Sequence, residues 1–361
     1  MKFSVTKSIL ENIVTNTVPF LEKKDMSSIT SHILFEVQNS NLTIKATDYE
    51  MGLVGVIDNL DEESCDNGKA TVNGKNLLEI IRRLKDQLIT IHTQDELLII
   101  EQNSSVFKLH TYNPDEYPEF PNNSDLKELS INNYDLINSI KKITPSIDNN
   151  NPKYELNGAL IQIDDDSINF VSTDTKRLSI VSFENKENFT TSLIIPKKAI
   201  IEIGKLFLND FNIKYDETNL VIESNEYKFF TKLLNGNFPD YKRIIPSEVK
   251  NAITLPKDKI IESIKLVTAM TPNVELTILN NTITFNGIDD NNDSEAKTQI
   301  QIDDLNISEE IGLKVNSRYI LDFLNSINTN QIELGFNDYN LPFYLKDDNF
   351  KAIVMPIFSN N

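Results

Sequence analysis

The chain has few of the residues on which catalytic and metal sites usually depend. Its 361 residues include one cysteine, three histidines, ten glycines and no tryptophan. The lone Cys65 excludes a disulfide framework and fits a reducing compartment. So few glycines leave little material for a phosphate-binding loop, and His32, His92 and His110 are not spaced as metal ligands.

Long apolar runs are also missing. No stretch approaches the roughly 18 residues that a membrane span needs, and the first residues lack the features of a signal peptide. We therefore expect a cytoplasmic protein. The formal net charge of −19 favours solubility and, for the chain as a whole, argues against simple nucleic-acid binding.

Two acidic stretches, Asp164–Asp166 and Asp289–Asp293, could suggest a cation site. Neither has the glycine and distal glutamate of a calcium loop, so solvated turns are favoured. Serines and lysines are plentiful, but no supporting group identifies a nucleophile. The sequence predicts no enzyme, no cofactor and no metal.

A strand–helix–strand pattern occurs three times in the chain. Its first strands are predicted at Phe3–Val5, Leu129–Ile131 and Ile253–Leu255. The helices that follow are predicted over residues 7–17, 135–143 and 259–267, each with apolar residues on one face. Alternating apolar residues after each helix predict a pair of strands.

A second triplet lies between these units. Strands at 70–72, 193–195 and 312–315 lead into helices predicted over 75–84, 197–207 and 317–327, again followed by paired strands. The sequence therefore predicts an α+β fold of three repeated domains, each made of two β-α-β-β-β half-units. We expect the domains at 1–126, 127–247 and 248–361. Threefold repetition of such a unit implies a curved or ring-like body.

Charge is distributed unevenly between the predicted elements. The six helices with their first turns carry a net +6, so the remainder carries −25. One interpretation is an ordinary solvated face on each amphipathic helix. The other is a helix surface that meets a polyanion through sequence-independent phosphate contacts. The cations that this second interpretation singles out are Arg82, Arg83, Lys142, Lys198 and Lys205.

Three blocks carry a resemblance to a known family. They are residues 156–178 (LNGALIQI…VSTDTKRL), residues 233–246 (LLNGNFPDYKRIIP) and the C-terminal VMPIF at 354–358. In this order they resemble the bacterial sliding clamp, the beta subunit of DNA polymerase III. The likeness is strongest between Tyr154 and Pro246. It implies DNA-clamp domains in a homodimeric ring around duplex DNA, with helices inside and sheets outside, that tethers the DNA polymerase III catalytic subunit, the clamp loader and other clamp-binding proteins.

The resemblance also implies an apolar pocket for partner peptides, whose anchors need a concave apolar site with a few polar groups at its rim. The matching positions are Leu156, Thr173, Thr175, Lys176, Arg177, Leu178, Pro239, Arg243, Ile244, Asn316, Tyr319, Ile353, Val354, Met355, Pro356 and Ile357. Any one of them could instead be a core residue at a domain junction. Two departures affect peptide preference: Thr175-Lys176 stand where the family often has Gly-His, and the tail is longer than usual.

Contacts with DNA and with a second copy are implied at fewer positions. Lys24, Lys153 and Tyr154 match the family's DNA-binding loops. Phe107 and Leu109 match its apolar ring contact, with Leu266 and Val267 as the expected partners.

The leading hypothesis is a processivity clamp. An interaction scaffold of the same fold that does not encircle DNA is the alternative. A hydrolase with carboxylates in an interdomain cleft is the third, and no motif in the sequence supports it.

Overall fold

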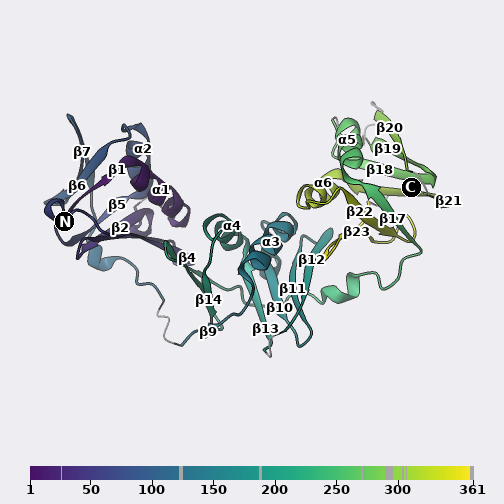
Figure 1. The fold of residues 1–361 in the computed structure, drawn as a ribbon, viewed down its shortest axis with the longest axis horizontal. Coiled ribbons are helices and arrows are strands. Elements are labelled where there is room, and N and C mark those ends of the chain that lie inside the picture. Colours follow the sequence, from purple (N-terminus) through teal and green to yellow (C-terminus); the bar gives the residue numbers. More distant parts are fainter. Residues whose placement is uncertain are drawn as a thin grey trace. The chain divides into compact units, whose positions relative to one another are not determined.

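The computed structural model describes residues 1–25, 27–121, 125–186, 189–269, 271–288, 296–302, 305 and 307–357. By their contacts, the residues form two compact units of antiparallel sheets and helices (Figure 1). The first unit holds Met1–Asn133 and Lys205–Leu233, and the second holds Tyr134–Gly204 and Leu234–Asn361.

The first unit contains two sheets. The four-stranded sheet runs in the order β1 (Lys2–Thr6), β6 (Leu88–Gln94), β7 (Leu97–Gln102) and β8 (Ser105–His110). The eight-stranded sheet runs in the order β5 (Gly68–Asn73), β2 (His32–Gln38), β3 (Asn41–Thr47), β4 (Met51–Ile57), β16 (Tyr227–Lys232), β15 (Asn219–Glu223), β14 (Asn212–Tyr215) and β9 (Lys127–Glu128). In the second of these sheets, β16 joins two segments that are distant in the sequence.

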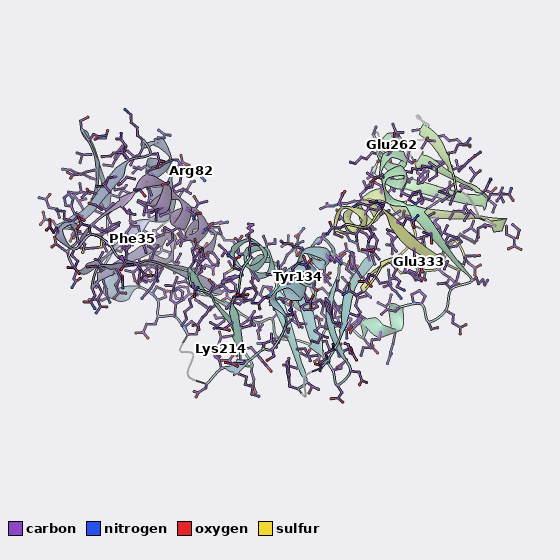
Figure 2. All side chains as sticks on the ribbon, viewed as in Figure 1. Phe35, Arg82, Tyr134, Lys214, Glu262 and Glu333 are labelled. Atoms are coloured by element: carbon purple, nitrogen blue, oxygen red, sulfur yellow. The ribbon has the colours of Figure 1, made fainter. Side chains whose placement is uncertain are left out.

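Helices α1 (Lys7–Thr17) and α2 (Gly74–Arg83) pack on these sheets. Each buries one apolar face, which on α1 includes Leu10, Ile13 and Val14. Burying such a side chain contributes about 1.5–3 kcal/mol. The Asn73 side chain accepts a hydrogen bond from the backbone of α2 and caps its first turn. Phe35 lies in the resulting core (Figure 2).

The second unit repeats this plan. Its eight-stranded sheet runs in the order β13 (Thr191–Pro196), β10 (Gly158–Ile163), β11 (Ser167–Thr173), β12 (Arg177–Glu184), β24 (Phe350–Val354), β23 (Phe343–Asp347), β22 (Gln331–Phe336) and β17 (Asn251–Pro256). Its four-stranded sheet runs in the order β20 (Ala296–Gln301), β19 (Thr282–Ile288), β18 (Asn273–Asn280) and β21 (Ile307–Asn316). The remaining helices are α3 (Asn133–Ile143), α4 (Lys197–Leu206), α5 (Lys257–Val267) and α6 (Ser317–Asn325).

The predicted α+β half-units are found in the structure. Strand β16 adds to β4, and β24 adds to β12, so each eight-stranded sheet combines two half-units. The contact-based division separates the strands of the second predicted domain, because β10–β13 lie in one unit and β14–β16 in the other. The boundaries at 126/127 and 247/248 stay predictions.

One predicted strand was misplaced. Residues Leu129–Ile131 are not a strand; β9 is Lys127–Glu128, two residues earlier. The Leu129 N–H still donates to the Ile213 carbonyl, but Ile131 turns back to donate to the Leu129 carbonyl. Local apolar alternation could not show where this edge pairing stops. The acidic turn at Asp289–Asp293 lies outside the described residues.

Candidate functional site

The elbow between β11 and β12 is shaped by the sequence Thr173-Asp174. The Thr173 hydroxyl donates to the Arg177 carbonyl at 2.6 Å and accepts from the Thr175 N–H at 3.1 Å. The Asp174 carboxylate accepts from the N–H groups of Lys176 and Arg177, both at 3.0 Å. These bonds hold Thr175 at φ +70°, a left-handed conformation that a β-branched residue rarely adopts.

Arg177 is buried at the end of this elbow. Its guanidinium pairs with Asp174 at 3.0 Å and with Asp322 of α6 at 2.7 Å. It also donates to the Pro145 carbonyl, and its Cζ lies 4.6 Å from the centre of the Tyr319 ring. Arg177 therefore fixes α6 against β12, rather than presenting a free cation at the surface.

The C-terminal segment is held beside the elbow. Strand β24 pairs with β12, so that Val354 lies opposite Arg177 and Ile353 opposite Leu178. Beyond the strand, the Met355 N–H donates to the Lys176 carbonyl at 2.9 Å. The backbone of the elbow thus positions the Met355 side chain.

An apolar hollow of about 560 Å³ lies at this junction. Its floor includes Leu178 and Ile353, which are buried, and its walls include the half-exposed Ile244 and Met355. Arg243 stands at the rim, with 84% of its side chain exposed, and pairs with Asp240 at 2.7 Å. We call this site the apolar hollow. It has the form that a short peptide with apolar anchors requires.

The hollow gathers half of the predicted pocket residues. Those that line it are Thr173, Thr175, Arg177, Leu178, Arg243, Ile244, Ile353 and Met355. The others do not line it: they are Leu156, Lys176, Pro239, Asn316, Tyr319, Val354, Pro356 and Ile357. Leu156 and Val354 are core residues, Tyr319 packs on Arg177, and Ile357 lines a different hollow.

Sequence reasoning missed part of the wall. The additional lining residues are Ile245, Pro246, Ser247, Glu248, Asn337, Leu341 and Pro342. The first four continue the Phe238–Ile244 block and could have been included. The segment Asn337–Pro342 follows β22 and reaches the hollow only through the pairing of β24 with β12, which no local pattern signals.

Most of the predicted DNA-binding side chains are exposed. Arg82 and Arg83 end α2, and Lys198 and Lys205 lie on α4 (Figure 2 labels Arg82). Arg82 makes a loose ion pair with Glu79 at 4.0 Å. Three more predicted residues are exposed in loops or a short helical turn: they are Lys24, Lys153 and Tyr154.

Lys142 differs from these cations. It is half-buried on α3, with its Nζ 5.5 Å from the centre of the Phe350 ring. The lysine therefore packs on an aromatic face, and less of its charge faces solvent.

The predicted ring-contact residues lie at two edges. Phe107 and Leu109 are half-buried on β8, an end strand of its sheet. On α5, Leu266 is 60% exposed, whereas Val267 is 2% exposed and belongs to the core. Of the two residues that were predicted at this end of α5, Leu266 is therefore at the surface and Val267 is not.

The described residues contain neither a membrane-spanning helix nor a cluster of metal-ligating side chains. None of their helices is long and apolar enough to cross a membrane. Among them, no group of three or more histidine, cysteine, aspartate or glutamate side chains could hold a metal ion.

Comparison with known proteins identifies the family. Residues 1–121, 130–240 and 242–358 match the N-terminal, central and C-terminal domain models of the DNA polymerase III beta subunit. A beta sliding clamp of Helicobacter pylori is 40% identical over 354 residues, which cover 96% of this chain and 94% of that protein. One from Vibrio cholerae is 26% identical and covers 99% of this chain and all of its own length.

Solved structures agree with these sequence matches. The Helicobacter pylori beta clamp bound to a DNA ligase peptide superposes with a TM-score of 0.91 at 39% identity, covering 99% of this chain and 100% of that one. A DNA polymerase III beta subunit from Pseudomonas aeruginosa, at 22% identity and a TM-score of 0.88, shares the fold. The chain therefore belongs to the DNA polymerase III beta subunit family and is a DNA sliding clamp, a processivity factor that catalyses no reaction.

Proposed function

We propose that two copies of the chain close head to tail into a ring around duplex DNA, and that the apolar hollow of each copy holds peptide segments of partner proteins. The main observation in favour of the ring is that strands of two half-units pair at two places within the chain. One matching pair of edge strands has no such partner within the chain. The identity of the partner proteins and the residues of each site do not follow from family membership and are part of this proposal.

The two junctions inside the chain have the same register. In the first, β16 lies beside β4, with Tyr227 opposite Gly55. In the second, β24 lies beside β12, with Phe350 opposite Val181. Tyr227 and Phe350 are the first residues of their strands. Gly55 and Val181 each lie opposite a fully buried residue of the neighbouring strand, Ile44 and Phe170.

Strands β8 and β20 occupy the equivalent positions in the half-units that remain. Each is the end strand of its four-stranded sheet. An end strand presents unpaired backbone groups that another chain can complete. Ser105 is the first residue of β8, and Thr298 of β20 lies opposite the buried Phe285. In the proposed ring, the same register would bring Ser105 of one copy opposite Thr298 of another.

The side chains agree with this pairing. At the first internal junction, Phe229 of β16 packs between Phe207 and Phe20, with ring centres 6.1 and 5.8 Å away. Phe107 occupies the equivalent position on β8 but is only half-buried. The exposed Leu266, at the end of α5, would cover Phe107 when the edges of two copies join. Since each copy has both edges, two copies use all of them and the ring closes.

Other features support the DNA and partner assignments. The exposed cations Lys24, Arg82, Arg83, Lys153, Lys198 and Lys205, with Tyr154, suit phosphate contacts without base preference. The DNA ligase peptide bound by the Helicobacter pylori clamp is the kind of partner that the apolar hollow fits. The polymerase III catalytic subunit and the clamp loader would dock in the same way. With these partners, the protein would act in the cytoplasm.

The experiment compares Phe107→Asp with Leu208→Asp, which changes another exposed apolar residue far along the chain. We expect native mass measurements to show dimers for the wild type and Leu208→Asp, and monomers for Phe107→Asp, because an unpaired charge in an apolar contact is costly. On nicked circular DNA, loaded rings should stay bound, and cutting the circle should release them. A dimeric Phe107→Asp protein at micromolar concentration, or equal retention on linear DNA, would contradict the proposed ring.

A further inference from the structure

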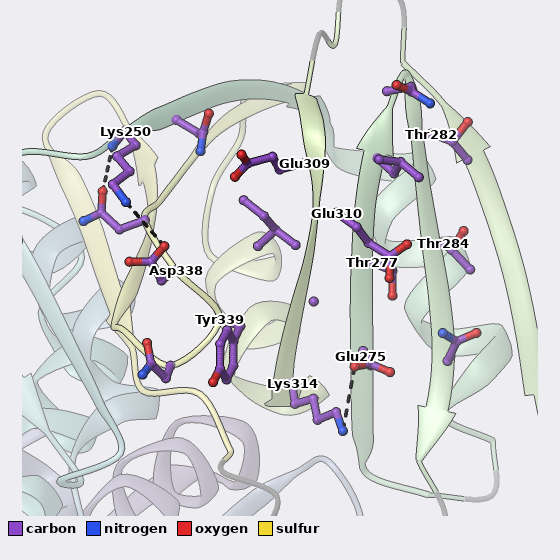
Figure 3. Close-up of a pocket in the computed structure, with 18 of the residues that line it drawn as sticks. Lys250, Glu275, Thr277, Thr282, Thr284, Glu309, Glu310, Lys314, Asp338 and Tyr339 are labelled. Carbon is purple, nitrogen blue, oxygen red and sulfur yellow. Dashed lines mark hydrogen bonds and ion pairs between the residues drawn. The ribbon is translucent and has the colours of Figure 1, made fainter.

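A second hollow, of about 1100 Å³, lies on the four-stranded sheet of the second unit (Figure 3). Strands β18, β19 and β21 form its floor, and the segment Asn337–Asn340, which includes Tyr339, forms a wall. We call it the polar hollow, because threonine, asparagine and charged side chains make up most of its lining. Its floor is the face of the sheet opposite the buried residues that pack under α5, among them Leu276 and Phe285.

In the second domain, the corresponding face of the sheet is covered by a segment of the chain. There, four paired residues form a buried apolar row across the strands: they are Ile180, Val171, Leu160 and Ile194. Leu234, Phe238 and Tyr241, from the segment after β16, pack on this row. The Leu234 N–H ties that segment to the sheet by donating to the Ile194 carbonyl at 2.9 Å.

The first domain has a similar arrangement. Its segment after β8 begins with Tyr112, whose N–H donates to the Thr71 hydroxyl at 2.8 Å. Tyr117 then reaches across the sheet and donates to the Lys45 carbonyl at 3.2 Å. In both domains, a chain segment anchored at one edge strand crosses the outer row of the sheet.

In the third domain the matching row is polar. Its four paired residues are Lys297, Asn286, Glu275 and Lys314. The anchoring hydrogen bond is present, from the Ile357 N–H to the Lys314 carbonyl at 2.7 Å. Among the described residues, no segment crosses the row, and the polar hollow occupies that place. The third domain thus keeps the surface on which a chain segment packs in the other two domains. In the third domain this surface is polar, whereas in the second it is apolar.

The carboxylates of Glu309 and Glu310 determine which charge the polar hollow attracts. Lys314 pairs with Glu275 at 3.8 Å, and Lys250 with Asp338 at 3.4 Å, as Figure 3 shows. Glu309 and Glu310 are exposed in the hollow, and among the described residues neither has an ion-pair partner.

A bulge in β21 explains why two consecutive carboxylates both line the hollow. The residues Ser308–Glu310 lie opposite the single residue Leu279, and such a bulge redirects side chains. With Lys297 as the one other unpaired charge of the described lining, the hollow favours a basic occupant.

The polar hollow adjoins the apolar one. Asn337 lines both, and the segment that follows it separates them, with Tyr339 on one side and Leu341 on the other. The C-terminal segment also leads from Met355 in the apolar hollow to Ile357 in the polar hollow. A chain bound in the first can therefore reach the second within a few residues.

We propose that the polar hollow receives an extended, polar segment that flanks the apolar anchors of a partner peptide, with a lysine or arginine placed against Glu309 and Glu310. The segment would cross the strands as the protein's own segments do in the other two domains. This proposal rests on the proposed function, because the anchors must first occupy the apolar hollow. It adds a determinant of partner choice outside that hollow.

The test uses the full-length protein and fluorescence anisotropy at low salt. The core probe is the DNA ligase peptide that the Helicobacter pylori clamp binds. Two further probes extend this peptide at its amino end by eight Gly/Ser residues together with either two lysines or two glutamates. Two more probes carry the same extensions at the carboxyl end. The proteins are the wild type, Glu309→Gln/Glu310→Gln, the floor-filling Thr277→Arg, and the charge-matched control Glu217→Gln/Glu226→Gln, whose exposed carboxylates lie on β14–β16 loops.

We expect the lysine extension, at one end only, to bind about fivefold more tightly than the core, as two partly exposed ion pairs would provide. Glu309→Gln/Glu310→Gln and Thr277→Arg should abolish this gain without changing core affinity, and the control should retain it. Equal affinities for core and extended probes, or a gain that survives in both hollow variants, would overturn the proposal. Failure of the core probe to bind would overturn the proposed pocket as well.

Discussion

The ion pair between Arg177 and Asp322 offers the sharpest test of how the apolar hollow is held together. Only 5% of the Arg177 side chain and 24% of that of Asp322 are exposed, and their atoms are 2.7 Å apart. Replacing Arg177 with Met keeps the aliphatic volume but leaves Asp174 without its cation and Asp322 with only the exposed Arg318. Removing one partner of a buried pair costs about 3–5 kcal/mol, and partial exposure favours the lower end of this range.

A double-mutant cycle isolates the pair. Asp322→Asn is nearly isosteric, and the coupling free energy with Arg177→Met should be about 2 kcal/mol. Arg318 provides the control, because it pairs with the same carboxylate at 3.5 Å but with 77% of its side chain exposed. The same cycle with Arg318→Met should give less than about 1 kcal/mol.

The coupling free energy should be measured at α6 itself and not by global unfolding, because a chain of several domains does not unfold in one step. Hydrogen exchange of the α6 amides reports the opening free energy of that helix directly. The DNA ligase peptide should also bind more weakly to Arg177→Met, because α6 and the elbow would no longer be fixed together. A coupling below about 0.5 kcal/mol, with α6 exchange unchanged, would refute the view that Arg177 holds the two elements.

Three further predictions concern other parts of the chain. Removing residues 355–361 should weaken partner-peptide binding at least about thirtyfold while dimer mass is retained, since an apolar anchor contributes about 2 kcal/mol; unchanged affinity would place the pocket elsewhere. Charge reversal at Arg82 and Arg83 should reduce DNA retention for all sequences alike and make it less sensitive to salt, which a base-specific contact would not do. Burial lowers the pKa of His32 from 6.5 to about 4, so the folded state disfavours the proton and stability is lost as pH falls below about 6.5. Between pH 7 and pH 5 this loss should be about 2 kcal/mol, measured as the difference from a His32→Phe variant in urea unfolding, and equal pH dependence in both proteins would contradict it.

Local chemistry made much of this structure predictable. The helices follow from apolar spacing, and the elbow follows from Thr173-Asp174, whose side chains bond to backbone within the same few residues. What the sequence could not show depends on distant partners. The resemblance named Arg177 as a pocket residue, but its ion pair with Asp322 and its contact with Tyr319 could not be foreseen because those residues are far away in the chain. The segment from Asn337 to Pro342 gave no signal for the same reason.

The repeat itself shows that an elbow is not sufficient for a binding site. In the first domain, the Thr47 hydroxyl donates to the Met51 carbonyl at 2.9 Å, and the Tyr49 backbone has φ +69°, as at Thr173–Arg177. The residue after Met51 is Gly52, where the second domain has Leu178. A Cβ at Gly52 would lie 2.4 Å from the Phe230 ring and 2.8 Å from the Phe120 ring. The protein's own aromatic side chains therefore occupy the space above the first elbow, whereas at the second Leu178 and Ile353 line the apolar hollow. The backbone motif sets the geometry, and the side chains packed on it decide whether the place is core or site.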